Sequence, residues 1–343
     1  MSTLKLHNSK PIGDNCPPYI IAEINTSHFG NIDIAKEMVV KAKEIGCDCV
    51  KFQSWSSETL YSKTFYEKNP IAKRMVKKLA FSEAELYAIY QHCQEVGIDF
   101  SSTPYSKDEV DFLADKCQVP FIKIASMELN NYPFLEYIAK KEMPIILSTG
   151  MGSINEIEKA VNVIEKAGNT NLCLLHCISI YPPEISTIRL KNILGLQKKF
   201  PNYVIGFSDH SLGIEMPTAA IALGASLIEK HFTLDKSRIG MDNQMALEPD
   251  EMKNMIENCH NVFQALGDTE RIVTNDEIEQ SKKMRRSLIA SRDLSAGTTL
   301  TINDIDAKRP GTGISPDRLN DIIGKTLVKD VEKDTLFSET DFQ

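Results

Sequence analysis

The sequence predicts a (β/α)8 TIM barrel followed by a small β-rich domain, and three observations support this fold class. Short β-branched runs alternate with segments of helical period from Tyr19 to about Gly267, as parallel strands alternate with crossover helices. The strand-like runs number eight, and eight strand–helix units over about 250 residues are typical of a closed barrel. No Gly-rich fingerprint follows the first run, whereas a doubly wound open sheet, the competing layout, normally has one and has fewer strands.

The predicted strands are short runs that begin apolar and end polar. Their ranges are 19–23, 49–53, 99–104, 121–126, 144–149, 172–177, 204–209 and 227–232. Helical segments between them include 34–45, 83–96, 154–167 and 250–266. Each of these four is followed by a glycine that suits a C-terminal cap: Gly46, Gly97, Gly168 and Gly267.

The chain is expected to contain two domains joined by a linker. We assign residues 1–267 to the barrel. Residues 268–284 carry many charges and few apolar side chains, which indicates a linker or an exposed helix. Residues 285–343 contain strand-like pieces at 287–290 and 327–331 together with turn signals, too few elements for another barrel. They are expected to form a small, loop-rich domain.

Composition and charge exclude several classes of protein. Of the 343 residues, 42% are hydrophobic and 25% charged, which excludes a disordered or collagen-like chain. A net charge of −8 without a long basic run argues against nucleic acid as a partner. Neither a signal peptide nor a run of about eighteen apolar residues is present, which predicts a cytosolic protein with no membrane partner. The eight cysteines include no Cys-x-x-Cys pair, so we expect reduced, mostly packed thiols.

The polar ends of the strands predict where the active site lies. Apolar layers fill a (β/α)8 barrel and substrates meet its C-terminal rim, so a whole ring of polar groups there favours function over a merely solvated rim. Lys51 and Lys123 are expected to point at a phosphate or carboxylate near the barrel axis, because a lysine inside a barrel is costly unless it meets an anion. The alternative is an ion pair with a nearby carboxylate, Glu23, Glu128 or Glu229.

Two histidines at the ends of adjacent predicted strands suggest a metal site. His210 and His231 would be neighbours on the rim of a closed barrel and could share one ion. The acidic residues Asp209 and Glu229 lie beside them in the sequence, and Asp242 lies in the following loop. Two imidazoles with oxygen ligands suit Mn, Fe, Co or Zn, and an incomplete protein shell leaves positions for water and substrate.

Two further rim residues receive different predictions. His28, in the loop after the first strand, could donate to substrate or phosphate. Lys230 alternates with Glu229 and His231, so it is expected to point away from the site and to be structural.

A series of short motifs, taken in order, is highly specific. They are Ala22-Glu23-Ile24 with His28 and Gly30, Val50-Lys51-Phe52-Gln53, Ser102-Thr103-Pro104, Lys123-Ile124-Ala125-Ser126 with Glu128, Asn130 and Asn131, Leu147-Ser148-Thr149-Gly150-Met151, His176-Cys177 with Tyr181-Pro182, Gly206-Phe207-Ser208-Asp209-His210, and Glu229-Lys230-His231-Phe232-Thr233 followed by Asp242. In them the chain resembles the sialic acid synthase family, which makes nonulosonic acids from phosphoenolpyruvate and an N-acylated amino sugar. Residues 285–343 resemble the antifreeze-like (SAF) domain of these synthases.

The resemblance implies roles for particular residues. A divalent metal, most suitably Mn²⁺ with Mg²⁺ or Co²⁺ as alternatives, would be held by His210 and His231. Phosphoenolpyruvate binding would fall to Lys51, Thr103, Lys123, Ser126, Ser148 and Ser208. Sugar contacts would fall to Glu23, Gln53, Tyr181, Asp242 and, in trans from the partner subunit of a domain-swapped homodimer, Arg309. The catalytic groups would be Glu23, Glu229, Lys51 and Lys123. The chain departs from common family patterns at Ser27 and Ser179, where relatives have Asn.

The implied reaction joins phosphoenolpyruvate to an amino-sugar aldehyde such as N-acetylmannosamine and releases phosphate. A legionaminic or pseudaminic acid synthase acting on a diacetamido-hexose is the alternative within the family, and the rim segment 55–78, with the single Trp, is expected to decide among these sugars. A barrel that condenses phosphoenolpyruvate with a sugar phosphate is disfavoured by the SAF-like domain. A non-catalytic binding protein is disfavoured by the charged rim and the paired histidines.

Overall fold

The computed structural model describes residues 2–7 and 9–343. The chain divides into two compact units, Met1–Gly267 and Asp268–Gln343.

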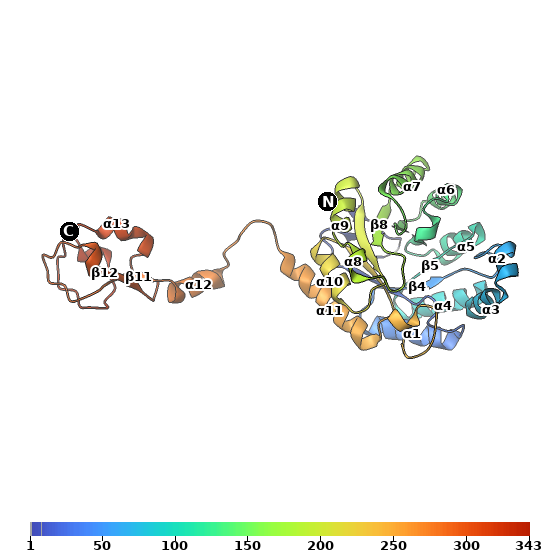
Figure 1. The fold of residues 1–343 in the computed structure, drawn as a ribbon, viewed down its shortest axis with the longest axis horizontal. Coiled ribbons are helices and arrows are strands. Elements are labelled where there is room, and N and C mark those ends of the chain that lie inside the picture. The colour runs from blue at the N-terminus through green and yellow to red at the C-terminus, as the bar shows by residue number, and fades with distance from the viewer. Residues whose placement is uncertain (1, 8) are drawn as a thin grey trace. The chain divides into compact units, whose positions relative to one another are not determined.

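An eight-stranded parallel sheet forms the centre of the first unit (Figure 1). Its strand order is β5–β4–β3–β10–β9–β8–β7–β6. The two outer strands of this order meet, because the Ser101 hydroxyl donates a 3.0 Å hydrogen bond to the Phe121 carbonyl just before β6. The sheet therefore curls into a nearly closed barrel, and the predicted fold class is confirmed. The strands are β3 Tyr19–Glu23, β4 Cys49–Gln53, β5 Asp99–Thr103, β6 Ile122–Ile124, β7 Ile145–Ser148, β8 Leu172–Cys177, β9 Val204–Asp209 and β10 Leu227–His231.

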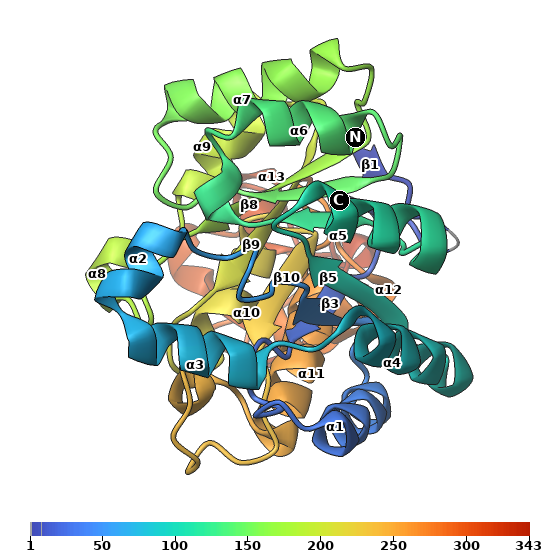
Figure 2. The ribbon, with the colours of Figure 1, turned by 90° about the vertical axis from the view of Figure 1, so that its right-hand side faces the viewer.

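Helices cover the outside of the barrel (Figures 1 and 2). They are α1 Ile32–Glu44, α2 Lys63–Lys68, α3 Pro70–Leu79, α4 Glu83–Val96, α5 Lys107–Asp111 with a π-helical continuation over Phe112–Cys117, α6 Tyr132–Ala139, α7 Ile154–Lys166, α8 Ile185–Ile188, α9 Asn192–Lys199, α10 Glu215–Ala222 and α11 Pro249–Leu266. Local sequence explains their ends. Ser82 and Glu85 form a capping box at the start of α4, and Gly97 closes that helix with a φ of 74°. Short 3-10 helices follow β6 at Ser126–Glu128 and β10 at Asn243–Met245.

The rim segment 55–78 differs from a simple loop. It contains α2 and most of α3. Asn69 separates the two helices, and Pro70 is the first residue of α3. Val76 and Leu79 are the buried residues of α3, while its lysines are exposed. This segment therefore presents an apolar face to the rest of the barrel.

A hairpin that the sequence analysis did not predict closes the N-terminal end of the barrel. The antiparallel strands β1 Thr3–Leu4 and β2 Ile12–Gly13 form it. Leu4, Leu6 and Ile12 are buried and pack in one cluster with the first inward residues of the strands, such as Tyr19 and Leu227. The interior of the barrel is thus sealed at this end.

The second unit is small and has its own core. Strands β11 Ser287–Ala290 and β12 Ile305–Lys308 pair antiparallel, and the helices are α12 Asn275–Met284 and α13 Leu319–Ile322 with 3-10 turns at Ile302–Asp304, Pro316–Arg318 and Glu339–Asp341. Leu288, Leu300 and Phe337 belong to the buried core. The predicted strand at 327–331 is wrong, since residues 327 and 331 make only isolated bridges to Phe342 and Leu294.

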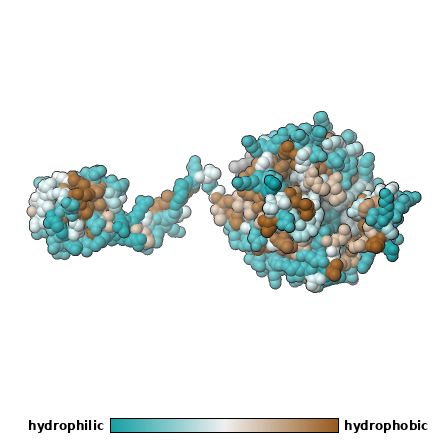
Figure 3. Space-filling view, viewed as in Figure 1, coloured by the Kyte–Doolittle hydropathy of each residue, from teal (hydrophilic) through white to brown (hydrophobic). Residues whose placement is uncertain are grey.

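Polar residues cover most of the face shown in Figure 3, with smaller apolar groups between them. No helix among residues 2–7 and 9–343 is both long enough and apolar enough to cross a membrane. All eight cysteines are free thiols, and every one except Cys16 is buried, as the sequence analysis expected.

Candidate active site

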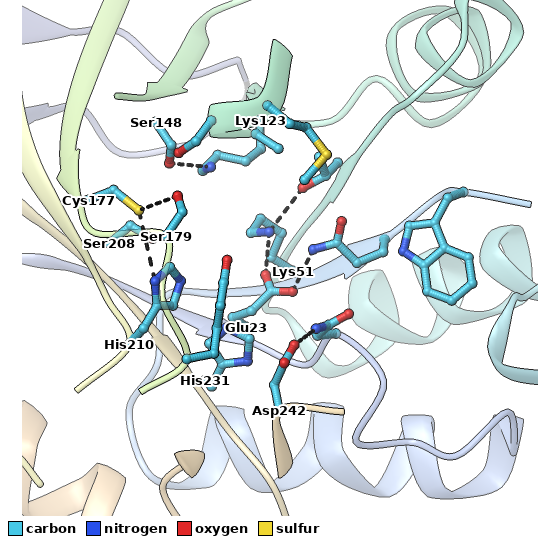
Figure 4. Close-up of a pocket in the computed structure, with 18 of the residues that line it drawn as sticks. Glu23, Lys51, Lys123, Ser148, Cys177, Ser179, Ser208, His210, His231 and Asp242 are labelled. Atoms are coloured by element: carbon cyan, nitrogen blue, oxygen red, sulfur yellow. Dashed lines mark hydrogen bonds and ion pairs between the residues drawn. The ribbon is translucent and has the colours of Figure 1, made fainter. Parts of the chain in front are cut away.

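A pocket of about 420 Å³ opens at the C-terminal ends of the barrel strands. This volume lies within the range of small-molecule sites. Its lining includes every barrel residue to which the family resemblance assigned a role: Glu23, Lys51, Gln53, Thr103, Lys123, Ser126, Ser148, Tyr181, Ser208, His210, Glu229, His231 and Asp242. Figure 4 shows the labelled members of this set converging on one space, from different strands and, for Asp242, from the loop after β10.

The strand register explains why these side chains meet. Residues two apart on a strand point to the same side, so Lys51 and Gln53 share the inner face of β4, and Glu229 and His231 share that of β10. Glu23 pairs in register with Lys51 on one side and with His231 on the other. Three neighbouring strands thereby bring an acid, an ammonium and an imidazole into one layer.

Two buried lysines form the floor of the pocket. Lys51 makes an ion pair with Glu23 and donates a 3.0 Å hydrogen bond to the Thr103 hydroxyl. Lys123 donates to the Ser148 hydroxyl at 2.7 Å and lies 3.7 Å from a Glu229 oxygen. Burial lowers the pKa of Lys123, and Glu229 opposes this shift. Both lysines line the pocket and pair with carboxylates, which is the alternative that the sequence analysis gave for them, and their role in binding a substrate anion stays a prediction.

The two floor carboxylates have pKa values that are shifted in opposite directions. Burial raises the pKa of Glu23, and this effect exceeds the opposing attraction of Lys51. Burial also disfavours ionised Glu229, but Lys123 and Lys51 outweigh it and lower that pKa. The Ser208 hydroxyl donates to Glu229 at 2.8 Å and further supports the ionised form. Two acids whose environments separate their pKa values are suited to opposite proton-transfer roles.

The paired histidines stand beside this floor. The ring centroids of His210 and His231 are 5.4 Å apart, and the Tyr181 ring lies 4.1 Å from that of His210. The Nδ1 atom of His210 is 2.8 Å from the Ile178 carbonyl oxygen. The Nδ1 atom of His231 is buried without a hydrogen-bond partner, and burial together with His210 holds the pKa of His231 well below its usual range. His231 is therefore a neutral imidazole with a nitrogen that no protein group satisfies.

This donor set fits a metal held by two imidazoles. Within the described part of the chain, no three His, Cys, Asp or Glu side chains converge closely enough to hold an ion by themselves. An ion here would rely on His210 and His231 and would take its remaining ligands from water or substrate, as catalytic sites with open positions do.

The side of the pocket assigned to the sugar is rich in hydrogen-bonding groups. The Asn25 amide donates to Asp242, and burial raises the pKa of that carboxyl group. The Gln53 amide donates to Glu23 at 2.8 Å and accepts from the Tyr105 hydroxyl at 2.9 Å. These contacts hold the side chains of Gln53 and Asp242 in fixed orientations.

Comparison with known proteins places this pocket in a family. A model described as the NeuB family matches residues 38–271, and a model of the SAF domain matches residues 285–343. The chain belongs to the NeuB family. It is 42% identical to the uncharacterized protein MJ1065 of Methanocaldococcus jannaschii, over 95% of this chain and 94% of that one. It is 38% identical to the N,N'-diacetyllegionaminic acid synthase of Legionella pneumophila, over 95% of each chain.

A solved structure agrees with this assignment. The N-acetylneuraminic acid (sialic acid) synthetase of Leptospira borgpetersenii superposes with a TM-score of 0.74 at 32% identity, over 81% of this chain and 96% of that one. The predicted resemblance to the sialic acid synthases is confirmed, and this NeuB-family member is related to nonulosonic acid synthases that make different products. Membership implies phosphoenolpyruvate and an amino sugar as substrates.

Some rim residues do not lie where the sequence analysis of this NeuB-family chain expected. His28 does not line the pocket, because its ring stacks on Phe81 at 4.1 Å and its Nδ1 accepts from the Gly30 backbone. Burial lowers the pKa of His28 to about 4, so it is a neutral structural residue.

Asp209 also faces away from the histidine pair. Its carboxylate accepts from the Lys230 ammonium at 2.6 Å, and both side chains are buried. The structural role predicted for Lys230 is therefore confirmed. Glu128, one possible partner of the lysines, instead accepts from the Asn131 amide. Arg309 lies in the second unit, where it is exposed in the loop after β12, and its role stays a prediction.

The NeuB-family pocket also contains residues to which the sequence analysis gave no individual role. An apolar part of its wall is formed by Tyr105 together with four residues of the segment 55–78 that was expected to decide among sugars, namely Trp55, Leu60, Tyr61 and Val76. Cys177 also lines it, with its thiol 4.0 Å from His210 Nδ1. Strand alternation could have shown that Cys177 faces inward, since it ends β8 in step with Leu175. No local signal shows that α3 folds back so that Val76 reaches the pocket.

Proposed function

We propose that this chain condenses phosphoenolpyruvate with the open-chain aldehyde of an N-acyl amino sugar, such as N-acetylmannosamine, and releases phosphate. The observation that carries the proposal is the floor of the pocket, where Lys51 and Lys123 meet two carboxylates of opposite pKa shift beside a histidine pair, in a member of the NeuB family. The two lysines supply the positive charge that a small trianion requires.

Phosphoenolpyruvate would lie on this floor. Lys51 and Lys123 would bind its carboxylate and phosphate, and four hydroxyl groups would complete the anion site: Thr103, Ser126, Ser148 and Ser208. Gly150 keeps this wall open, because a Cβ there would lie 2.3 Å from the Ser179 hydroxyl and 2.8 Å from that of Ser126. The substrates would thus be held in line before bond formation.

The floor acids would divide the proton transfers. The methylene carbon of phosphoenolpyruvate forms a bond to the aldehyde carbon. Glu23, whose pKa burial raises and which the bound phosphoenolpyruvate would replace as the anionic partner of Lys51, would deliver a proton to the aldehyde oxygen. Water then adds to the cationic C2 carbon, and Glu229, ionised between the lysines, would accept its proton. Cleavage of the C2–O bond releases phosphate, whose charge Lys51 and Lys123 would stabilise.

A divalent metal, with Mn²⁺ as the leading choice, is part of this proposal. His210 and His231 would hold it, and when bound it would polarise the aldehyde oxygen as negative charge develops there. Mn²⁺ binding followed by electron paramagnetic resonance should be saturable in the wild-type protein and much weaker in His210→Ala and His231→Ala. Equal Mn²⁺ binding by correctly folded variants would contradict this assignment.

The main test is an assay of phosphate release. Purified protein with Mn²⁺, phosphoenolpyruvate and N-acyl amino sugars should release phosphate only when both organic substrates are present. The mass of the product should equal the summed masses of phosphoenolpyruvic acid, the sugar and one water molecule, minus that of phosphoric acid. Phosphate release only with a sugar phosphate would indicate the related class of condensing barrel instead.

We further infer a domain-swapped homodimer in which Arg309 contacts the acyl group in the partner's pocket. Arg309 is exposed, and no ion pair of its guanidinium is found among the described residues. Mixing inactive Arg309→Ala and His231→Ala subunits should restore roughly a quarter of wild-type activity, because half of the random dimers are mixed and each has one intact site. An unchanged, inactive mixture whose subunits do exchange would contradict the swapped arrangement.

A further inference from the structure

The pocket has an apolar arm beside its polar floor. We define the arm by Trp55, Leu60, Tyr61, Val76 and Tyr105, all of which line the pocket. Trp55 and Val76 are buried and pack in one cluster, with Leu60 and Tyr105 against it. Tyr61 is 42% exposed and forms the outer part. The arm therefore offers aromatic and aliphatic surface to whatever extends beyond the floor.

Two hydrogen bonds and one close backbone contact hold the arm in place. The Glu109 carboxylate accepts from the Tyr105 backbone at 2.6 Å and from the Thr59 hydroxyl at 2.7 Å, which ties the segment after β4 to the segment after β5. Gly30, with a φ of 73°, lies so close to α3 that an added Cβ would be 2.1 Å from the Lys78 carbonyl oxygen. A preformed apolar surface of this kind selects ligands by shape and polarity.

The described lining of the pocket leaves no lysine for a second phosphate. Among the described residues that line it, the lysines are Lys51 and Lys123, and the carboxylates are Glu23, Glu229 and Asp242. Both lysines are already paired with carboxylates and would both be needed for phosphoenolpyruvate. A further phosphate in the pocket would meet an excess of carboxylates and an apolar wall, which is unfavourable.

The cations of α2 and α3 do not fill this gap. The Lys73 ammonium lies over the Tyr66 ring at 5.6 Å, and Lys63 lies 3.9 Å from Glu67. Both lysines are exposed and neither lines the pocket. They belong to the solvent side of the segment whose other side forms the arm.

We propose that the apolar arm determines specificity by binding the end of the sugar that is remote from the aldehyde, and that it selects an unphosphorylated sugar whose substituents there carry methyl groups, such as a 6-deoxy sugar with a further N-acetyl group. This inference rests on the proposed function. The methyl groups of such a sugar remove apolar surface from water against Trp55 and Val76, whereas a hydroxymethyl group gains less and a phosphate is rejected.

Trp55 permits a direct binding test, because it is the chain's only tryptophan. Its fluorescence should change saturably with a 2,4-diacetamido-2,4,6-trideoxyhexose, about tenfold more weakly with N-acetylmannosamine, and least with N-acetylmannosamine 6-phosphate. The order of kcat/KM for phosphate release should be the same. A 6-phosphate that binds most tightly, or three sugars that leave the Trp55 emission unchanged, would overturn the inference.

A charge placed in the arm should reverse the selection. Tyr61→Lys puts an ammonium group at its outer edge and should lower binding of the diacetamido sugar while raising that of the 6-phosphate. Phe65→Lys is the matched control, since Phe65 stacks on Tyr61 at 4.3 Å and is similarly exposed but does not line the pocket. An equal shift in both variants would mean that general electrostatic attraction, and not the arm, sets the preference.

The two readouts separate this inference from the proposed function. Trp55 emission reports occupancy of the arm whether or not turnover occurs. Selective sugar binding without phosphate release would contradict the proposed reaction and support the arm. Phosphate release without the predicted order of sugar preference would support the proposed reaction and contradict the role of the arm.

Discussion

Neutralising Glu229 should destabilise the free protein and increase the stabilisation that phosphoenolpyruvate confers. Each of its oxygens lies 3.7 Å from one ammonium group, Oε1 from Lys123 and Oε2 from Lys51. At an effective dielectric constant of about 20, each attraction is worth about 4.5 kcal/mol before desolvation. Glu229→Gln keeps an oxygen for the Ser208 hydroxyl and removes only the charge. Lys51 keeps its ion pair with Glu23, but Lys123 loses the carboxylate that lies 3.7 Å from its ammonium group.

Breaking a buried pair in this way costs about 3–5 kcal/mol. For a unit of this size we expect the Tm of the free variant to fall by roughly 6–20 °C. Phosphoenolpyruvate should then raise Tm by more in Glu229→Gln than in the wild type, because the bound anion replaces the missing charge, while kcat falls by about 10²–10⁴. Calorimetry with and without phosphoenolpyruvate measures this, with Glu128→Gln as a rim control. An unchanged Tm together with an equal phosphoenolpyruvate shift would refute the reasoning.

Three other predictions concern stability and pocket shape. The folded state keeps His28 neutral down to about pH 4, whereas the unfolded chain takes up a proton near pH 6.5. The free energy of unfolding should therefore decrease by at most about 3 kcal/mol as the pH is lowered from 6.5 to 4. Urea unfolding of His28→Phe at a series of pH values should show a smaller decrease over this range. Lys230→Met leaves the Asp209 carboxylate buried and unpaired and should lower the free energy of unfolding by about 3–5 kcal/mol. The double variant Lys230→Met/Asp209→Asn should recover much of this loss. Strictly additive losses of the two single variants would contradict a coupled pair. Gly150→Ala should reduce kcat/KM for phosphoenolpyruvate about tenfold or more with little change in Tm, and unaltered kinetics would show that Ser179 yields to the new methyl group at no cost.

Alternation along the strands made most of this site predictable. A period of two, with apolar residues first and polar residues last, identifies Lys51, Glu229 and His231 as inward-facing at the C-terminal rim. The same alternation places Asp209 outside, between inward Ser208 and His210, and it was the adjacency in sequence that wrongly suggested an acid beside the metal site.

Features that depend on distant packing could not be predicted in this way. His28 is structural because Phe81, far along the chain, supplies a ring to stack on. The apolar arm exists because α3 folds back on Gly30, and no local pattern encodes that contact. Strands β1 and β2 are two residues each, too short for any periodicity to reveal.

That N-terminal hairpin has a kinetic consequence. Since Leu4 and Ile12 seal one end of the barrel, reactants and products must use the single opening at the other end. The anion site formed by Lys51 and Lys123 lies at the floor, so a sugar that arrived first would block the route to it. Productive turnover should therefore begin with phosphoenolpyruvate entering first, and an unreactive sugar analogue that occupies the free pocket should inhibit competitively with respect to phosphoenolpyruvate.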